Sequence, residues 1–323
     1  ADGKRARSVL AGAMCEPETL QPGASCPDDF EAFWNAKRAE LDAMPFAPKI
    51  EPVPSLTNDK IETWSIQLKN INGTTIQGFF AKPKGPGPFP AVMAVHAAGV
   101  YGIGPGTVAA YARHGALAID INPHNIPNGK PKEFYADLKK GALRGYPHMG
   151  RASRETSYFL RMFCSCYRAA QYITSRPEWD GEKLVVWGSS QGGGQAFVTA
   201  GLCSKVSAFT ANVPALCDHA GLLLKRRSGW PQWVALKDGA PDPDMLTAGK
   251  YFDCANFARL TSATALVSCG FIDRTCSPTS VWAAYNVLQG EKGMENMVRT
   301  GHGINTNFRR RQRKFILDQL GLK

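Results

Sequence analysis

The alternation of short strand-like runs with helical patterns after residue 90 is the feature that most restricts the fold of this 323-residue chain. Strand-like runs occupy 90–96, 116–121, 183–189, 207–213, 263–269 and 295–300, and helical patterns are expected near 106–113 and over 151–175, 191–202 and 278–289. Strands and helices that alternate in this way form a mostly parallel sheet covered by helices on both faces. The expected fold class is therefore α/β.

The residues before this alternating region predict a different arrangement. Residues 62–70 and 75–83 flank the turn signal Asn72-Gly73, a combination typical of an antiparallel hairpin. Apolar residues recur at helical spacing within 28–43, which predicts an amphipathic helix. We therefore expect an N-terminal hairpin and a helical extension beside the main sheet.

Two long connections interrupt the alternating region, at about 122–150 and at about 214–260. Connections of this length in a compact fold usually form lids or binding loops. We expect both to be insertions in a single domain over 27–323, with residues 1–26 as an N-terminal extension.

Composition excludes several classes of protein. Hydrophobic residues make up 44% of the chain and charged residues 20%, which is ordinary globular usage and leaves enough apolar surface for a buried sheet. No apolar stretch reaches the roughly 18 to 20 residues that a membrane-spanning helix requires.

The chain starts at Ala1 without an initiator Met or a charged-then-apolar leader, which favours a secreted or periplasmic location and leaves a cytoplasmic one open.

The formal net charge of +11 includes basic clusters at Lys4, Arg5 and Arg7 and over 309–314. A charge of this sign suits an acidic partner. The clusters contain no interleaved aromatic residues and match no motif that reads nucleic acid. We therefore expect neither nucleic acid nor a membrane as a partner.

The nine cysteines are an odd number spread over a large chain, so they do not imply a disulfide framework. Cys15 and Cys26 bracket a segment rich in Pro and Gly, and they form either a bridge or two free thiols. Cys164 and Cys166 lie two apart in a predicted helix, where they face different directions and do not make a metal pair. We expect no metal and no cofactor.

The segment Gly188-Ser189-Ser190-Gln191-Gly192 matches the pattern Gly-x-Ser-x-Gly at a predicted strand-to-helix junction. The pattern alone is weak evidence, and its position gives it meaning. A serine on such a strained turn is presented as a nucleophile, and only small residues are tolerated two positions to either side. The first N–H groups of the helix face the developing oxyanion. Ser190 is the predicted nucleophile.

The loop after the strand at 90–96 carries His96-Ala97-Ala98-Gly99. In hydrolases with this kind of turn, the corresponding loop supplies an oxyanion donor, and we assign that role to the backbone N–H of Ala98. His96 is an alternative catalytic base, but it precedes the nucleophile, whereas the required chain order is serine, acid, histidine. His96 is therefore expected to be structural.

Asp273 lies just beyond a late predicted strand, and His302 comes directly after the last one. The order Ser190, Asp273, His302 is that of the catalytic triad in the α/β-hydrolase fold. His302 would take the Ser190 proton and Asp273 would hold the imidazole, so these residues predict a serine hydrolase that forms an acyl-enzyme. The competing acids, expected to have capping or surface roles, are Asp218, Asp253 and Asp318.

From about Pro27 the chain resembles the acetyl xylan esterase and cephalosporin C deacetylase family of carbohydrate esterases. The segments that carry the resemblance are CPDDFEAFW, YRAAQYITSRPEWD, GSSQGG, NVPALC, KYFDCANFA and GFIDRTCSPTSVWAAYN. The resemblance implies an α/β-hydrolase that hydrolyses short-chain, mainly acetyl, esters of sugar-like alcohols, with an acetylated small molecule or oligosaccharide as substrate. It gives Ser190, Asp273 and His302 the roles inferred above. It also implies that the backbone N–H of Gln191 is the first oxyanion donor.

Two departures from the family pattern indicate a divergent branch. Residues 121–125 read INPHN where the family usually has an Arg-Gly-Gln motif, so a structural anchor near the site is missing or replaced. Gly303 follows the predicted base where the family tends to have Glu. The alcohol portion of the substrate and the ring-like hexamer of the family are therefore not carried over, and a homo-oligomer stays open.

The residues predicted to contact substrate are Tyr101, Trp230, Trp233 and Arg226. Packing against the body of the domain is the alternative for the two tryptophans. The basic run 225–227 would favour anionic glycans if it faced the site, although such runs are usually solvated. Small residues follow the nucleophile at 192–194 and face it at 97–99, which predicts an acyl pocket sized for acetyl.

Two other functions are compatible with this fold. A serine peptidase of the prolyl-oligopeptidase type shares the fold and the triad order, but it usually has an aromatic residue where this chain has Gln191. A non-enzymatic binding module would be expected to lose at least one triad residue, and all three are retained. We therefore expect a serine esterase.

Overall fold

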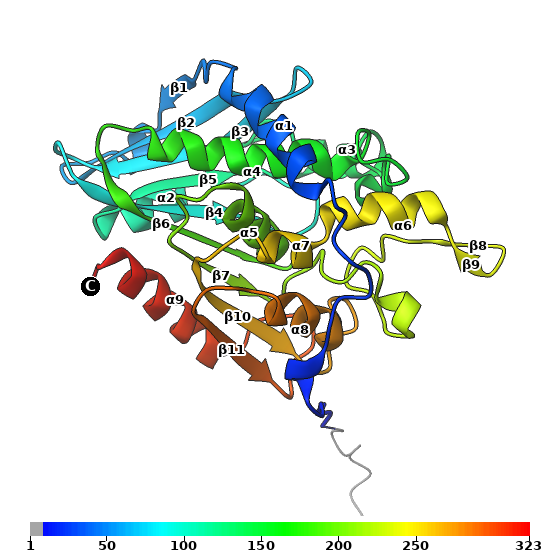
Figure 1. Ribbon diagram of the computed structural model, residues 1–323. Helices are drawn as coiled ribbons and strands as arrows, with labels where there is room; N and C mark the ends of the chain where they lie inside the picture. The colour runs from blue at the N-terminus through cyan, green and yellow to red at the C-terminus, as the bar shows by residue number, and fades with distance from the viewer. Residues whose placement is uncertain (1–8) are drawn as a thin grey trace, which may run out of the picture.

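A nine-stranded sheet forms the centre of the computed structural model, which describes residues 9–323 (Figure 1). In spatial order its strands are β1 (Lys49–Pro52), β2 (Ile61–Lys69), β3 (Thr75–Pro83), β5 (Leu117–Ile121), β4 (Phe89–Val95), β6 (Trp179–Ser189), β7 (Ala208–Asn212), β10 (Thr264–Gly270) and β11 (Lys292–Met297). Pairing is antiparallel from β1 to β5 and parallel from β5 to β11. The predicted α/β class with a mostly parallel sheet is confirmed.

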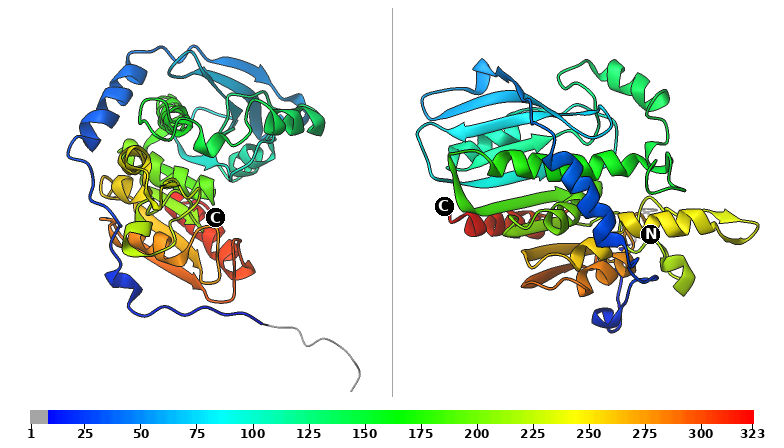
Figure 2. Two further views of the ribbon diagram at one scale, coloured as in Figure 1. Left: turned by 90° about the vertical axis from the view of Figure 1, so that its right-hand side faces the viewer. Right: turned by 45° about the horizontal axis from the view of Figure 1, so that its top comes forward.

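Helices cover both faces of the sheet (Figures 1 and 2). One face carries α1 (Phe30–Asp42), α4 (Tyr158–Thr174), α5 (Gln191–Leu202), α7 (Cys254–Ala258) and α8 (Pro278–Asn286), and the other carries α2 (Gly106–Arg113) and α9 (Thr306–Leu320). The long connections contain α3 (Lys132–Lys140), α6 (Pro243–Gly249) and a small ribbon of β8 (Leu236–Lys237) and β9 (Ala240–Pro241). The short 3₁₀ turns are η1 (Pro17–Thr19), η2 (Pro54–Leu56), η3 (Tyr146–His148), η4 (Gly221–Leu224) and η5 (Lys250–Phe252).

The central strands are mostly apolar because they are buried on both faces. In β6, Val185 packs into the cluster formed with α2 and α9, while its neighbours Leu184 and Val186 pack into the larger cluster under α4 and α5. Successive side chains of a strand point to opposite faces, so each strand feeds two cores. A strand that slipped by one residue would move every side chain to the opposite core, so this alternation favours one register between neighbouring strands.

The local predictions agree with the structure except at some boundaries. The predicted hairpin is β2 and β3, and the helix predicted at 191–202 has those bounds in α5. The helix predicted at 151–175 begins only at Tyr158, because the preceding residues form turns and Ser157 Oγ accepts a hydrogen bond from Phe159 N at 3.3 Å. The last strand ends at Met297 rather than at 300.

The described part of the N-terminal segment lies against α8 and the loops near it. Asn286 Nδ2 donates to the backbone oxygens of Pro17 and Leu20 at 2.8 and 2.9 Å. Cys15 and Cys26 are both free thiols, so the bridge between them is not formed. The basic cluster at Lys4, Arg5 and Arg7 lies outside the described residues.

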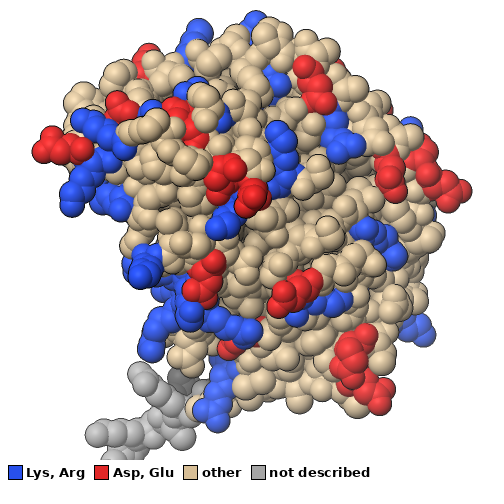
Figure 3. All heavy atoms as spheres, turned by 60° about the vertical axis from the view of Figure 1, so that its left-hand side comes forward, with Lys and Arg blue, Asp and Glu red and all other residues tan. Residues whose placement is uncertain are grey.

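The second basic cluster is spread along the exposed face of α9, and part of its charge is balanced locally. Arg311 pairs with Glu295 at 2.5 Å and Lys314 pairs with Asp318 at 2.7 Å. Figure 3 shows acidic side chains scattered among the basic ones on the face that it presents. Within residues 9–323, none of the helices is long and apolar enough to cross a bilayer.

Candidate active site

The predicted catalytic residues meet at the edge of the sheet where the parallel strands end. Ser190 directly follows β6, Asp273 lies in the loop after β10, and His302 lies in the loop after β11. The carboxyl ends of parallel strands share one edge, which is where open α/β sheets form their sites. The fold therefore gathers three residues that are far apart in the sequence.

The turn that carries Ser190 is strained and tightly packed. Ser190 has φ 56° and ψ −120°, a conformation that non-glycine residues rarely adopt. A Cβ on Gly188 would lie 2.4 Å from the Gly192 carbonyl carbon, and one on Gly192 would lie 2.4 Å from Val95 O. The turn excludes side chains at both positions, which is the physical basis of the Gly-x-Ser-x-Gly pattern.

His302 bridges the other two residues by a hydrogen bond from each ring nitrogen. Its Nε2 lies 2.8 Å from Ser190 Oγ, and its Nδ1 lies 2.8 Å from Asp273 Oδ2. A carboxylate can only accept, so Nδ1 carries the proton and Nε2 is free to accept from the serine hydroxyl. Ser190 and Asp273 are buried, whereas His302 is exposed and opens the site to solvent.

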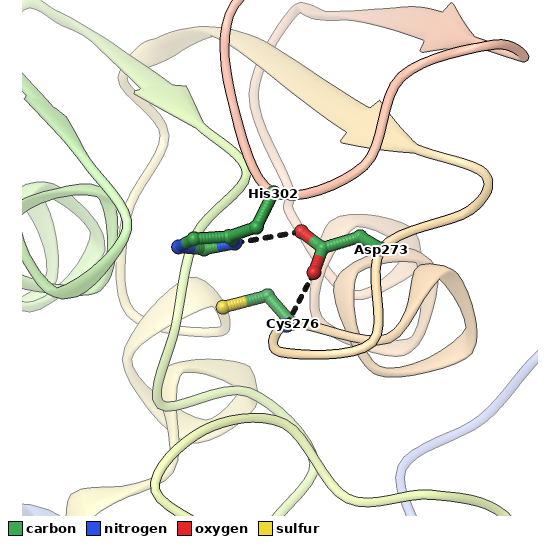
Figure 4. Close-up of side chains that lie close together, drawn as sticks. All are labelled: Asp273, Cys276 and His302. Carbon is green, nitrogen blue, oxygen red and sulfur yellow. Dashed lines mark hydrogen bonds and ion pairs between the residues drawn. The ribbon is translucent and has the colours of Figure 1, made fainter.

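The remaining oxygen of Asp273 fixes the orientation of its carboxylate. Oδ1 accepts hydrogen bonds from the backbone N–H groups of Thr275 and Cys276 at 2.7 and 3.0 Å. Figure 4 shows the two oxygens directed to different partners, one toward His302 and one toward the loop after β10. The acid is held in place by its own loop.

Sequence reasoning missed Cys276, whose buried side chain points toward the imidazole of His302 (Figure 4). One ligand atom from each of Asp273, Cys276 and His302 lies within 4.8 Å of the others, which is compact enough for a metal ion. Both oxygens of Asp273 already have partners, and burial raises the pKa of the Cys276 thiol well above its usual range. We therefore assign the cluster to the triad. The sequence feature that could have indicated this contact is the position of Cys276, three residues after Asp273 in the same loop.

His96 has a different partner from the nucleophile. Its Nε2 lies 2.5 Å from Oδ1 of Asp120, a buried residue of β5. Burial raises the pKa of Asp120, and the hydrogen bond with His96 opposes that rise. His96 thus compensates a buried carboxyl group, as expected for a structural residue.

The competing acids also have structural partners. Asp253 accepts hydrogen bonds from the N–H groups of Asp218, His219 and Ala255 at 2.9, 2.6 and 3.0 Å, and burial raises its pKa to about 6. Asp318 pairs with Lys314 on α9. The predicted capping role is confirmed for Asp253, the N-cap of α7, and the surface role for Asp318. The prediction is wrong for Asp218, which is buried and pairs with Arg226.

The loop after β4 is held by residues from the segment that replaces the Arg-Gly-Gln motif. Asn122 Nδ2 donates to the backbone oxygen of Tyr101 at 2.9 Å, and His124 Nε2 donates to that of Gly99 at 2.8 Å. Tyr101 Oη donates to Ala97 O at 2.8 Å within the loop itself. Two residues of the segment 121–125 thus hold the loop after β4 in place.

Burial determines the charge state of His124. Desolvation lowers the pKa of His124 to about 4, so its ring is neutral at pH 7. Because Gly99 O can only accept, the proton lies on Nε2, and Nδ1 accepts from Tyr158 Oη at 2.6 Å. A neutral imidazole with both nitrogens paired connects α4 to the loop.

The glycines after the nucleophile have a different role from the predicted one. A Cβ on Gly193 would lie 2.9 Å from Pro214 Cα, and one on Gly194 would lie 2.6 Å from Ala215 O. These glycines admit neighbouring protein backbone, so they are not evidence for a small acyl pocket. The acetyl preference must rest on other observations.

The structure corrects two of the residues predicted to contact substrate. Trp233 is fully buried, where it stacks on Phe252 with ring centroids 5.1 Å apart and donates from Nε1 to Arg151 O at 2.9 Å. Arg226 pairs with Asp218 Oδ2 at 2.9 Å and with the N-terminal segment. Both side chains hold the long connection in place: Trp233 is buried away from any substrate, and the guanidinium of Arg226 is engaged by Asp218 and the N-terminal segment.

The other two predicted contacts lie next to the catalytic loops. Trp230 is partly buried, and its backbone N–H donates to Thr275 O at 3.0 Å, two residues beyond the acid. Tyr101 is partly buried in the loop that contains Ala98. Their contact with substrate stays a prediction.

Comparison with known proteins gives a consistent result. A family model described as "Acetyl xylan esterase (AXE1)" matches residues 13–319. The acetyl esterase Axe7A of Xylanibacter ruminicola is 32% identical over 294 residues, which are 90% of this chain and 66% of that protein, so the chain spans less than two thirds of this relative.

Two solved structures have the same fold. The acetyl xylan esterase from Paenibacillus sp. R4 has a TM-score of 0.78 and 25% identity, and covers 93% of this chain and 98% of its own. Acetyl xylan esterase 1 from Thermoanaerobacterium sp. JW/SL YS485 has a TM-score of 0.79 and 21% identity, with 94% and 98% covered. The extent of the family match, added to the site geometry, shows that the chain belongs to the acetyl xylan esterase family.

Proposed function

We propose that this chain is a serine esterase that hydrolyses short-chain esters, chiefly acetyl esters of carbohydrates, through Ser190, His302 and Asp273. The observation that carries the proposal is the continuous line of two 2.8 Å hydrogen bonds from Ser190 Oγ through His302 to Asp273. The acetyl group as the acyl portion is supported by family membership and by the acetyl esterase relative.

Acylation follows from the placement of these groups. As Ser190 Oγ attacks the ester carbonyl carbon, its proton passes to His302 Nε2, and Asp273 stabilises the positive imidazole. The tetrahedral intermediate then collapses, the bond to the alcohol oxygen breaks, and His302 returns the proton to the leaving alcohol. The product is an acetyl ester of Ser190.

Deacylation repeats the same steps with water. Water gives a proton to His302 and attacks the acyl carbon, and collapse of the second intermediate releases acetate and restores the Ser190 hydroxyl. Because His302 is the exposed member of the triad, water reaches it directly.

Two backbone N–H groups are proposed to stabilise the oxyanion. Gln191 is the first residue of α5, where an N–H has no partner within the helix and lies at the positive end of its dipole. Ala98 lies in the loop after β4, which begins at His96. A Cβ built on Gly192 would lie 2.9 Å from the carbonyl carbon of His96, so this loop and the start of α5 are adjacent. These positions support Gln191 and Ala98 as the two donors.

Hydrolysis of p-nitrophenyl esters of increasing acyl length, beside acetylated xylan and cephalosporin C, tests the proposal. Activity should be highest for acetyl, fall by roughly 10- to 200-fold at butyryl and be negligible at octanoyl, since overpacking an acyl pocket costs about 1 to 3 kcal/mol. A maximum at butyryl or longer, or cleavage of a proline-containing peptide, would instead favour another acyl hydrolase of the same fold.

A further inference from the structure

One tyrosine hydroxyl joins the two segments proposed to build the oxyanion hole. Tyr146 Oη donates to Gln191 Oε1 at 2.7 Å and accepts from Gly99 N at 3.2 Å. Gln191 is the residue after the nucleophile, and Gly99 is the residue after Ala98. The hydroxyl therefore spans the gap between the helix end and the loop after β4.

The position of this hydroxyl is well determined by its surroundings. Tyr146 belongs to η3 in the first long connection, is buried, and meets the His124 ring edge to face with centroids 4.7 Å apart. Burial raises the pKa of Tyr146, so its hydroxyl keeps its proton and donates it to Gln191. Both hydrogen-bonding capacities of the group are used at once.

The side chain of Gln191 has no second anchor among the residues that the structure describes. It is fully buried, its Oε1 is paired with Tyr146, and its Nε2 has no partner. Removing the tyrosine hydroxyl would leave the buried Oε1 of Gln191 and the partly buried N–H of Gly99 without this partner, and an unpaired buried acceptor is costly.

We propose that Tyr146 is a positioning residue that sets the separation of the two oxyanion donors by joining the Gln191 side chain to the backbone of Gly99. The inference rests on the esterase function proposed above. Oxyanion donors act only when they point at the place where negative charge develops, so a small displacement of one of them slows the chemical steps more than it weakens substrate binding.

Tyr146→Phe tests the proposal because it removes the hydroxyl and keeps the ring. For p-nitrophenyl acetate, kcat should fall by roughly 10- to 100-fold, below the loss for removing a donor outright, with KM within about threefold. The acid limb of the pH profile of kcat/KM should stay in place, because Ser190, Asp273 and His302 are untouched. Tyr167→Phe is the matched control, since the ring of Tyr167 is buried and its hydroxyl donates to Asp42, the last residue of α1, at 3.0 Å, and it should keep wild-type kcat.

Gln191→Met provides the second arm, because it removes the acceptor but keeps the backbone N–H. If the hydroxyl acts through Gln191, the double variant loses no more activity than the worse single variant. Unchanged kcat in Tyr146→Phe, a rise confined to KM, or additive losses in the double variant would each overturn the proposal. A wild-type protein without esterase activity would overturn the proposed function together with it, whereas an active wild type with an unaffected Tyr146→Phe overturns this inference alone.

Discussion

His124 Nε2 lies 2.8 Å from the backbone oxygen of Gly99, so a buried and neutral imidazole holds the loop beside the nucleophile. The pKa of His124 is lowered from about 6.5 to about 4 by burial. Between these values the unfolded chain binds a proton at this position and the folded chain does not. The free energy of unfolding therefore loses a contribution from His124 as the pH falls through this range.

The first prediction concerns this pH dependence. This contribution of His124 to the free energy of unfolding is roughly 3 kcal/mol, fully present above about pH 6.5 and lost by about pH 4. In His124→Gln the amide can still donate to Gly99 O but does not titrate. Urea unfolding at pH 7 and pH 4.5 should show the variant closer in stability to wild type at the lower pH. A stability gap that stays constant between the two pH values would contradict the assigned state of His124.

The second prediction separates the two candidate bases. His302→Ala should lower kcat by about 10⁴-fold, because it removes the acceptor of the Ser190 proton. His96→Gln should keep activity within about tenfold and mainly lower the melting temperature, since His96 pairs with the buried Asp120. Steady-state rates with p-nitrophenyl acetate, measured beside melting curves, decide the matter. The reverse ranking of the two variants would make His96 the base.

The third prediction addresses the role of the acid. In Asp273→Asn the side-chain oxygen can still accept from Thr275 and Cys276, while the new amide NH₂ faces His302 Nδ1 and favours the wrong tautomer. We expect a loss of roughly 10²- to 10⁴-fold in kcat with an unchanged melting temperature. Circular dichroism serves as the control for folding. A variant with wild-type kcat would show that Asp273 does not orient the base.

The sequence predicted the site residues that local patterns mark, and it did not predict those whose contacts are distant along the chain. Ser190, Asp273 and His302 were predictable because each follows a strand end, and strand ends are marked by local patterns. Trp233 and Arg226 were assigned wrongly because their partners, Phe252 and Asp218, come from the packing of a long connection that has no periodicity.

Tyr146 was missed for the same reason. Its partners Gly99 and Gln191 lie 47 and 45 residues away along the chain, and the first long connection contains no signal that would bring them together. Asn122 and His124, which hold the loop after β4, could likewise be identified only from their contacts.

The fourth prediction concerns thiol reactivity. Cys15 is exposed, Cys26 is partly buried, and the other cysteines are buried, where desolvation keeps the thiol protonated and unreactive. An aromatic disulfide reagent should modify Cys15 rapidly in the native protein, and all nine cysteines should react in denaturant without a reductant. A denatured count of seven would reveal a bridge between Cys15 and Cys26.

The proposed esterase activity depends on Ser190 being the single activated serine. Its hydroxyl is the one that lies 2.8 Å from the ring nitrogen of His302, on a turn that holds it in a strained conformation. The most direct test is to react the protein with a fluorophosphonate probe and locate the adduct by mass spectrometry, with Ser190→Ala as the control. We expect one adduct, on Ser190, and no labelling of the variant. An adduct on another residue, or labelling of Ser190→Ala at the wild-type rate, would contradict the assignment.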